Sequence, residues 1–146
     1  MLENKRYVSG SPEETKRIAA EIAKELEKGD VLCMYGDLGA GKTAFVQGLA
    51  KGLGIDGHIT SPTFTIVNEY YGKFPLYHFD VYRIADPDEM YEIGYDEYIY
   101  GNGICVIEWP QLIDEILPQK RYNITITKDY EKHENYRLIE VKGIGK

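Results

Sequence analysis

Long apolar runs and an excess of positive charge are both missing from this chain of 146 residues. No run of about 18 apolar residues occurs, and the first ten residues lack the apolar stretch of a signal peptide. We therefore expect a cytoplasmic protein without membrane contact. The 24 acidic residues outnumber the 17 Lys and Arg residues, which leaves a net charge of -7. Such a field repels polyanions, so we expect no DNA binding and no autonomous binding of other nucleic acids.

Cysteine is also scarce, since only Cys33 and Cys105 occur. Two thiols alone do not make a zinc site, and a chain of this length does not need a disulfide. Each cysteine lies inside an apolar run, at 31–34 and 104–107. A thiol in such a run packs as a small hydrophobic side chain, so we expect both in the core.

Residues 36–43 match the phosphate-loop motif G-x-x-x-x-G-K-[ST], with Gly36, Asp37, Leu38, Gly39, Ala40, Gly41, Lys42 and Thr43 in order. Backbone N–H groups of such a loop curl around phosphates, and its glycines permit the close approach. Lys42 would reach the β- and γ-phosphate oxygens, and the Thr43 hydroxyl would ligate Mg²⁺ that bridges them. A purely structural turn has no use for Lys42 at this place.

The surrounding pattern predicts one α/β domain over residues 1–146, with a mixed parallel and antiparallel sheet flanked by helices. Repeats, low-complexity tracts and linkers are absent. The predicted helices run from Ser11 to near Gly29, from the phosphate loop to 52–54, and over 86–94. The predicted strands cover 31–35, a hairpin of 64–71 with 76–82, 104–109, 122–127 and 136–141.

A metal ion bound to phosphate needs a carboxylate ligand, and two acidic residues are candidates to supply it. Glu108 follows four apolar residues. This pattern is typical of a buried strand that ends in an acidic residue at the edge of a sheet. Asp80 ends a less apolar run, in which His78, Asp80 and Tyr82 alternate and are expected to share a face. Mg²⁺ prefers oxygen ligands, so we expect His78 to be a hydrogen-bonded strand residue. The residues alone leave both acids open.

Four blocks, at 36–43, 61–65, 78–83 and 107–109, closely resemble the TsaE (YjeE) family in order and spacing, and 11–15 and 117–118 also fit. The resemblance covers nearly the whole chain. It implies a P-loop ATPase that binds ATP and Mg²⁺ and is weak alone but active with the TsaB and TsaD proteins. Its implied role is tRNA threonylcarbamoyladenosine modification next to the anticodon, with tRNA touched only through the partners.

The resemblance also implies roles for single residues. Thr43 and Glu108 would be metal ligands, and Asp80 would belong to the metal and water shell. The implied catalytic set is Lys42, Asp80 and Glu108. Residues 61–64 look like a switch loop near the γ-phosphate, and Trp109 looks like a packing or nucleotide-sensing residue, with a core tryptophan as the alternative. Nucleotide contacts beyond the phosphate loop would come from Ser11, Thr15, Thr63 and Trp109.

Three other functions are alternatives to this one. A small-metabolite kinase would be expected to carry an arginine-rich lid, whereas the arginines here are scattered. A guanine-specific switch would need an Asn-Lys-x-Asp motif, which is absent. A nucleotide-gated binding module without autonomous hydrolysis stays open. The acidic, tyrosine-containing segment 86–100 is either a solvated surface helix or a surface for a basic partner.

Overall fold

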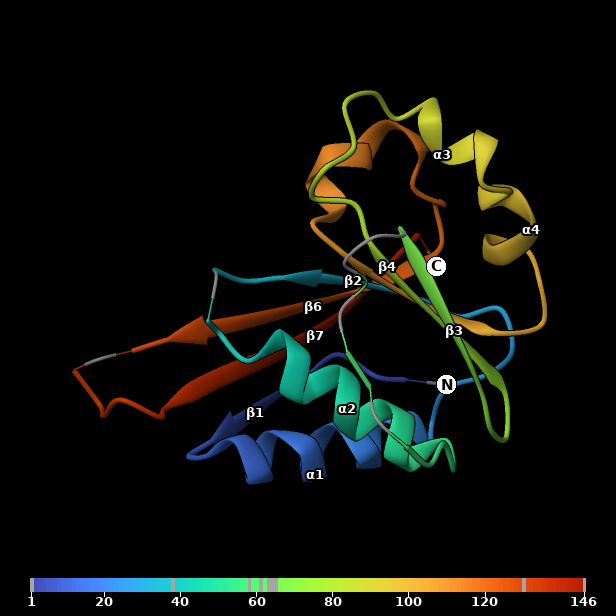
Figure 1. Cartoon of the computed structure of the whole chain (residues 1–146). Coiled ribbons are helices and arrows are strands. Elements are labelled where there is room, and N and C mark those ends of the chain that lie inside the picture. The colour runs from blue at the N-terminus through green and yellow to red at the C-terminus, as the bar shows by residue number, and fades with distance from the viewer. Residues whose placement is uncertain are drawn as a thin grey trace.

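The computed structural model describes residues 2–37, 39–57, 59–60, 62, 66–129 and 131–145. These residues form one seven-stranded sheet in the order β1-β7-β6-β2-β5-β4-β3, with helices on both faces (Figure 1). None of the described helices has the length and apolar character needed to cross a bilayer. The elements are β1 (Lys5–Ser9), α1 (Pro12–Ala23), β2 (Val31–Tyr35), α2 (Lys42–Gly52), β3 (Val67–Tyr71), β4 (Pro75–Asp80), α3 (Glu89–Glu92), α4 (Tyr95–Ile99), β5 (Ile104–Glu108), the 3-10 helix η1 (Pro110–Ile116), β6 (Arg121–Lys128) and β7 (Arg137–Ile144).

The centre of the sheet is parallel and its margins are antiparallel, which confirms the predicted mixed sheet. β2 pairs in parallel with β5 and β6, and β4 pairs in parallel with β5. The β3–β4 hairpin extends one margin, and β7 and β1 extend the other. Because the carboxyl ends of parallel strands meet at one edge, the turn after β2 lies at the same edge as the ends of β4, β5 and β6.

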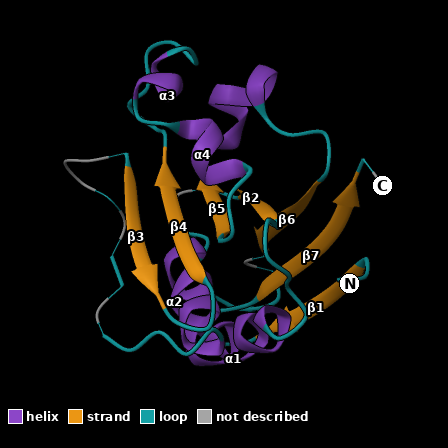
Figure 2. Cartoon of the chain, turned by 90° about the vertical axis from the view of Figure 1, so that its right-hand side faces the viewer, coloured by secondary structure: helices purple, strands orange, loops and turns teal. Residues whose placement is uncertain are grey.

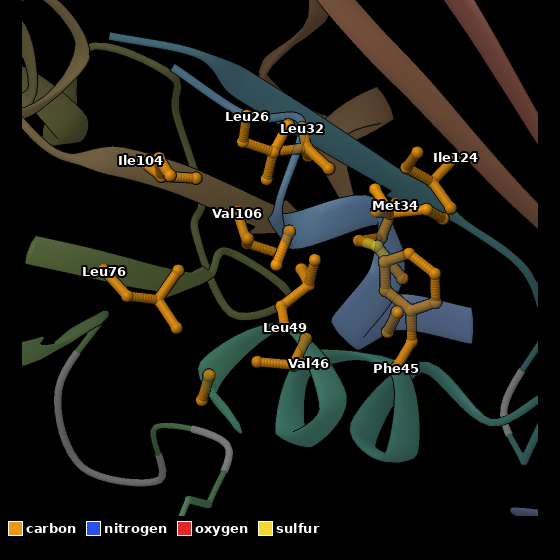
Figure 3. Close-up of a cluster of buried hydrophobic side chains, with 14 of the residues drawn as sticks. Leu26, Leu32, Met34, Phe45, Val46, Leu49, Leu76, Ile104, Val106 and Ile124 are labelled. Carbon is orange, nitrogen blue, oxygen red and sulfur yellow. The ribbon is translucent and has the colours of Figure 1, made fainter. Parts of the chain in front are cut away.

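The sheet separates two hydrophobic cores. Helices α1 and α2 cover one face, and α3, α4 and η1 cover the other (Figure 2). Figure 3 shows Phe45 and Leu49 of α2 facing Met34, Val106 and Ile124 of the central strands. These residues are fully buried, so the apolar side of α2 anchors the helix directly behind the phosphate loop.

Helix α1 begins as predicted but ends earlier. The Ser11 side chain accepts a hydrogen bond from the Glu14 N–H, and the Glu14 carboxylate accepts one from the Gly10 N–H, which is a capping box. The helix ends at Ala23 rather than near Gly29. The N–H groups of residues 24–26 donate to carbonyl oxygens three residues earlier in the chain, instead of four as in an α-helix. This tighter winding still carries Leu26 into the core.

Some elements lie beyond what local patterns predicted. The structure adds β1, α4 and η1. The helix predicted over 86–94 is the single turn α3, because Gly94 adopts a left-handed φ of 82° and separates it from α4. The predicted strand over 104–109 ends at Glu108. The hairpin is confirmed by the pairing of β3 with β4, whereas 64 and 65 lie outside the described residues.

Helices α1 and α2 approach so closely that only glycine fits between them. A Cβ atom on Gly48 would clash with the Lys16 carbonyl oxygen and lie 2.8 Å from the Cβ of Ala19. One turn later, a Cβ atom on Gly52 would lie 2.6 Å from the Ala20 carbonyl oxygen. The carbonyl oxygens belong to the backbone of α1 and cannot move aside like a flexible side chain, so a larger residue would force the helices apart.

We expect Gly48→Ala to destabilise the fold by about 1–2 kcal/mol. Overpacking of a core costs about 1–3 kcal/mol, and the better helix propensity of alanine recovers up to about 1 kcal/mol. Urea denaturation measures the free energy of unfolding. Lys51→Ala, at an exposed position of the same helix, is the control and should change it by less than about 0.5 kcal/mol. A Gly48→Ala protein as stable as the parent would contradict the close packing.

Both cysteines are buried, as predicted, in the core beneath α4 and η1. Burial raises the pKa of the Cys33 and Cys105 thiols to about 12, because a buried site disfavours the thiolate. An unfolded thiol has a pKa near 8.5. Between about pH 8.5 and 12 the unfolded state therefore binds fewer protons than the folded state.

We accordingly expect the free energy of unfolding to fall as pH rises above about 8.5, by up to roughly 1.4 kcal/mol per pH unit for each thiol. Below that pH the two thiols add no pH dependence. Denaturation series at pH 7.5 and 10 would measure the loss. A Cys33→Ala, Cys105→Ala double variant should lose less stability over the same interval, and an equal loss would contradict the raised pKa values.

Candidate nucleotide-binding site

The phosphate loop (residues 36–43) forms the turn from β2 into α2. Gly39 and Gly41 have left-handed φ angles of 79° and 104°, and a Cβ atom on Gly36 would lie 2.8 Å from the Ile126 carbonyl oxygen. Gly41 is the N-cap of α2, and no described side chain caps the helix. The first N–H groups of α2 are thus suited to an anion. Leu38 lies outside the described residues.

Lys42 begins α2 with only 7% of its surface exposed. Its Nζ atom lies 4.0 Å from the centroid of the Trp109 ring, a cation–π contact that partly compensates the buried charge. The Tyr82 ring packs against Trp109 with centroids 4.9 Å apart. The ring covers the phosphate-loop lysine and also packs against the core beneath α4 and η1, so a contact of Trp109 with a nucleotide stays a prediction.

The backbone of Trp109 is itself unusual. Its φ of 63° makes it the single non-glycine residue with positive φ in the described part of the chain. Such a conformation costs about 1–3 kcal/mol and is often found at functional sites. Here it directs the chain from β5 into η1 and turns the ring onto Lys42.

Glu108 ends β5, the strand next to β2, and is 4% exposed. Nε2 of His78 lies 2.5 Å from Oε2 of Glu108. The other ring nitrogen, Nδ1, has no hydrogen-bond partner among the described residues. The prediction that His78 is a hydrogen-bonded strand residue is confirmed, and its partner is a predicted site acid.

Asp80 ends β4 and lies in register with Glu108. Its Oδ1 atom accepts a hydrogen bond of 3.0 Å from the N–H of Tyr82, which turns the chain away from the strand. The prediction that Tyr82 continues the face of His78 and Asp80 is therefore wrong, since β4 ends at Asp80. The structure brings both acids to the edge of the phosphate loop, with Glu108 one strand nearer to it.

The donors available to a metal ion are oxygen atoms. Thr43 is exposed in the first turn of α2. Within the described ranges, no group of three or more His, Cys, Asp or Glu side chains is arranged to hold a metal. A divalent cation at this edge would thus need the Thr43 hydroxyl and phosphate oxygens besides a carboxylate, which is the usual environment of Mg²⁺.

Three further predicted nucleotide contacts have different outcomes. The Ser11 hydroxyl caps α1, and the Thr15 hydroxyl lies 2.7 Å from that of Ser9 in a buried position. The structure gives both hydroxyls a local role, and their contact with a nucleotide stays a prediction. Thr63 lies outside the described residues, as does most of the predicted switch loop at 61–64.

A cavity of about 550 Å³ opens beside the phosphate loop, between it and the end of β6. It is lined by Gly36, Asp37, Ala40 and residues 125–128. A second cavity of about 490 Å³ lies at the opposite edge of the sheet, near Asp30 and Arg121. The volumes do not distinguish the two cavities. The first is the candidate site because Gly36, Asp37 and Ala40 of the phosphate loop line it.

Comparison with known proteins agrees with this geometry. The family model described as threonylcarbamoyl adenosine biosynthesis protein TsaE matches residues 9–137. The chain belongs to the TsaE family. The family resemblance inferred from the sequence blocks is thereby confirmed.

Curated TsaE relatives match most of the chain. The tRNA threonylcarbamoyladenosine biosynthesis protein TsaE of Bacillus subtilis is 54% identical over 119 residues, which cover 81% of this chain and 74% of the relative. The protein of the same name from Treponema pallidum is 48% identical, with 84% and 89% covered. The crystal structure of Bacillus subtilis YdiB has a TM-score of 0.80 at 44% identity and covers 99% of this chain and 88% of that one. The fold is P-loop NTPase-like, as predicted.

One contact of the loop lies outside the TsaE blocks found in the sequence. Arg137, the first residue of β7, donates from Nε to the Ala40 carbonyl oxygen at 2.8 Å and from Nη2 to that of Gly39 at 3.3 Å. No local pattern indicated this residue, because it reaches the loop from the far end of the chain.

Proposed function

We propose that this chain is a Mg²⁺-dependent ATP-binding P-loop ATPase that acts in tRNA threonylcarbamoyladenosine biosynthesis together with TsaB and TsaD proteins. The observation that carries the proposal is the buried Lys42 at the open N-terminus of α2, beside the end of β5, in a chain of the TsaE family. A lysine at this position can bind phosphate oxygens that enter the loop.

The phosphate loop would bind ATP by its backbone and by Lys42. The ammonium of Lys42 rests on the Trp109 ring, and a cation–π contact of this kind is worth about 0.5–2 kcal/mol. A charge-assisted bond to a phosphate oxygen is stronger, so the lysine would exchange the ring for the β- and γ-phosphates. Without nucleotide, the Trp109 ring would keep the Lys42 ammonium near the loop.

The oxygen donors at the edge fit a magnesium ion, with Thr43 and Glu108 as the residues that would hold it. When bound, Mg²⁺ neutralises charge on the phosphate oxygens. His78 fixes the Glu108 carboxylate, and the partly exposed Asp80 is placed to orient a water molecule. The position of β5 beside β2 supports Glu108 rather than Asp80 as the direct ligand.

The proposed route to tRNA passes through the partner proteins. A net charge of -7 opposes direct binding to a polyanion. The acidic segment that includes α3 and α4 exposes Tyr91 and Tyr100 at 49% and 75%. Exposed tyrosines among acids suit a basic protein surface, and their use as a partner contact stays a prediction.

We expect Lys42→Ala to abolish ATP binding, because the loop then loses its side-chain charge toward the phosphates. Titration calorimetry with ATP and Mg²⁺ measures the affinity. Lys51→Ala, an exposed lysine later in the same helix, is the matched control and should bind like the parent. If Lys42→Ala bound within about threefold of the parent, a difference of roughly 0.7 kcal/mol, the phosphate-loop assignment would be refuted.

Glu108→Gln and Asp80→Ala should separate hydrolysis from binding. Carboxylates that act on the metal or the attacking water stabilise the transition state more than the ground state. We expect turnover in the reconstituted complex with TsaB and TsaD to fall roughly 100-fold, more for Glu108 than for Asp80, while ATP affinity changes far less. Glu21→Ala, an exposed acid of α1 outside the segment proposed as a partner surface, is the control. Normal turnover of both site variants would exclude the metal-shell assignment.

A further inference from the structure

Arg137 makes four hydrogen bonds, and backbone carbonyl oxygens accept all of them. Two lie in the phosphate loop, on Ala40 at 2.8 Å and Gly39 at 3.3 Å. The other two lie in the connection before β7, on Glu134 at 2.9 Å and Tyr136 at 2.7 Å. One guanidinium thus joins the β6–β7 connection to the loop, and both lie at the same end of the sheet (Figure 1).

These bonds determine which way the loop presents its amides. The described chain contains no cis peptide bond, and in a trans peptide the C=O and the next N–H point in opposite directions. A carbonyl of Ala40 held by Arg137 directs the Gly41 N–H to the other side, away from the guanidinium. The carbonyl of Gly39 likewise fixes the N–H of Ala40, which donates to the Asp37 carbonyl oxygen within the loop at 3.0 Å.

The segment that Arg137 holds contains glycines, which have the greatest conformational freedom of the backbone. Gly39 and Gly41 occupy left-handed conformations, and glycine loses more conformational entropy on ordering than any other residue. A contact that orders this segment therefore has its largest effect here. Arginine suits the role because its planar fork donates in several fixed directions at once, whereas lysine donates from a single point.

We propose that Arg137 is a positioning residue of the phosphate loop: it holds the Gly39 and Ala40 carbonyls outward, so that the Gly41 amide faces the phosphates, and it ties this arrangement to the β6–β7 connection. The proposal rests on the proposed nucleotide site. Arg137 acts through the backbone, and the positive charge it places behind the loop also favours an anion in front of it.

Arg137→Ala and Arg137→Lys test the proposal, with Arg121→Ala as the matched control. Arg121 also begins a strand and donates to a carbonyl of the preceding turn, that of Pro118 at 3.0 Å, but at the opposite edge of the sheet. We expect ATP–Mg²⁺ affinity, measured by calorimetry, to fall at least about tenfold in both Arg137 variants and less than twofold in Arg121→Ala. Methylguanidinium should restore part of the affinity of Arg137→Ala and none of that of Lys42→Ala.

A second readout needs no nucleotide. The amide ¹H–¹⁵N signals of Gly39 and Gly41 should shift or broaden in Arg137→Lys and stay unchanged in Arg121→Ala, with circular dichroism confirming that each variant is folded. If Arg137→Ala does not fold, Arg137→Lys alone decides. Folded Arg137 variants that bind ATP within threefold of the parent would overturn the inference and leave the proposed function intact. A parent protein that binds no ATP would overturn both.

Discussion

The parallel pairing of β2 with β5 is the constraint on which the rest of the structure depends. Parallel strands cannot be joined by a tight turn, so the chain that leaves β2 crosses over through α2 and the β3–β4 hairpin before it returns as β5. That path sets the end of β5 beside the glycine turn. Lys42 and Glu108, which are far apart in the chain, thereby come to one edge of the sheet. Trp109, whose backbone is in the left-handed conformation, extends its ring from the end of β5 to Lys42.

Charge is distributed very unevenly over this molecule. The chain carries a net charge of -7, yet Lys42, Lys128 and Arg137 surround the phosphate loop, with Lys128 lining the adjacent cavity. The field of the whole molecule keeps polyanions such as nucleic acids away, whereas the local field at the loop favours a small one. If the proposed function holds, selection between an RNA backbone and a nucleotide would begin with the size of the anion, before any contact with a base.

Features set by neighbouring residues could be predicted from the sequence, and features set by distant ones could not. The helix start at Ser11, the apolar strand 31–35 and the phosphate loop are local, and all three occur as expected. β1 forms only because β7 pairs with it, and the partner of His78 follows from the register of β4 against β5. The hydrogen bonds of Arg137 to Gly39 and Ala40 also depend on that long-range assembly. The apolar runs before Glu108 and Asp80 indicated both acids as candidates, but which of them lies nearer to β2 depends on the strand order.

The position of β1 has a consequence for how the molecule is built. β1 (residues 5–9) is synthesised early, but it pairs with residues 137–141, so its hydrogen bonds wait until nearly all of the described chain has left the ribosome. Helix α1 can already dock on α2 by then, because both precede residue 53. Pairing across such a sequence separation is slow, and the open edge meanwhile carries Lys5 and Arg6, charges of the kind that discourage association of unpaired strands. Among the described strands, the one that comes first in this sequence can therefore pair only after the one that comes last has been made.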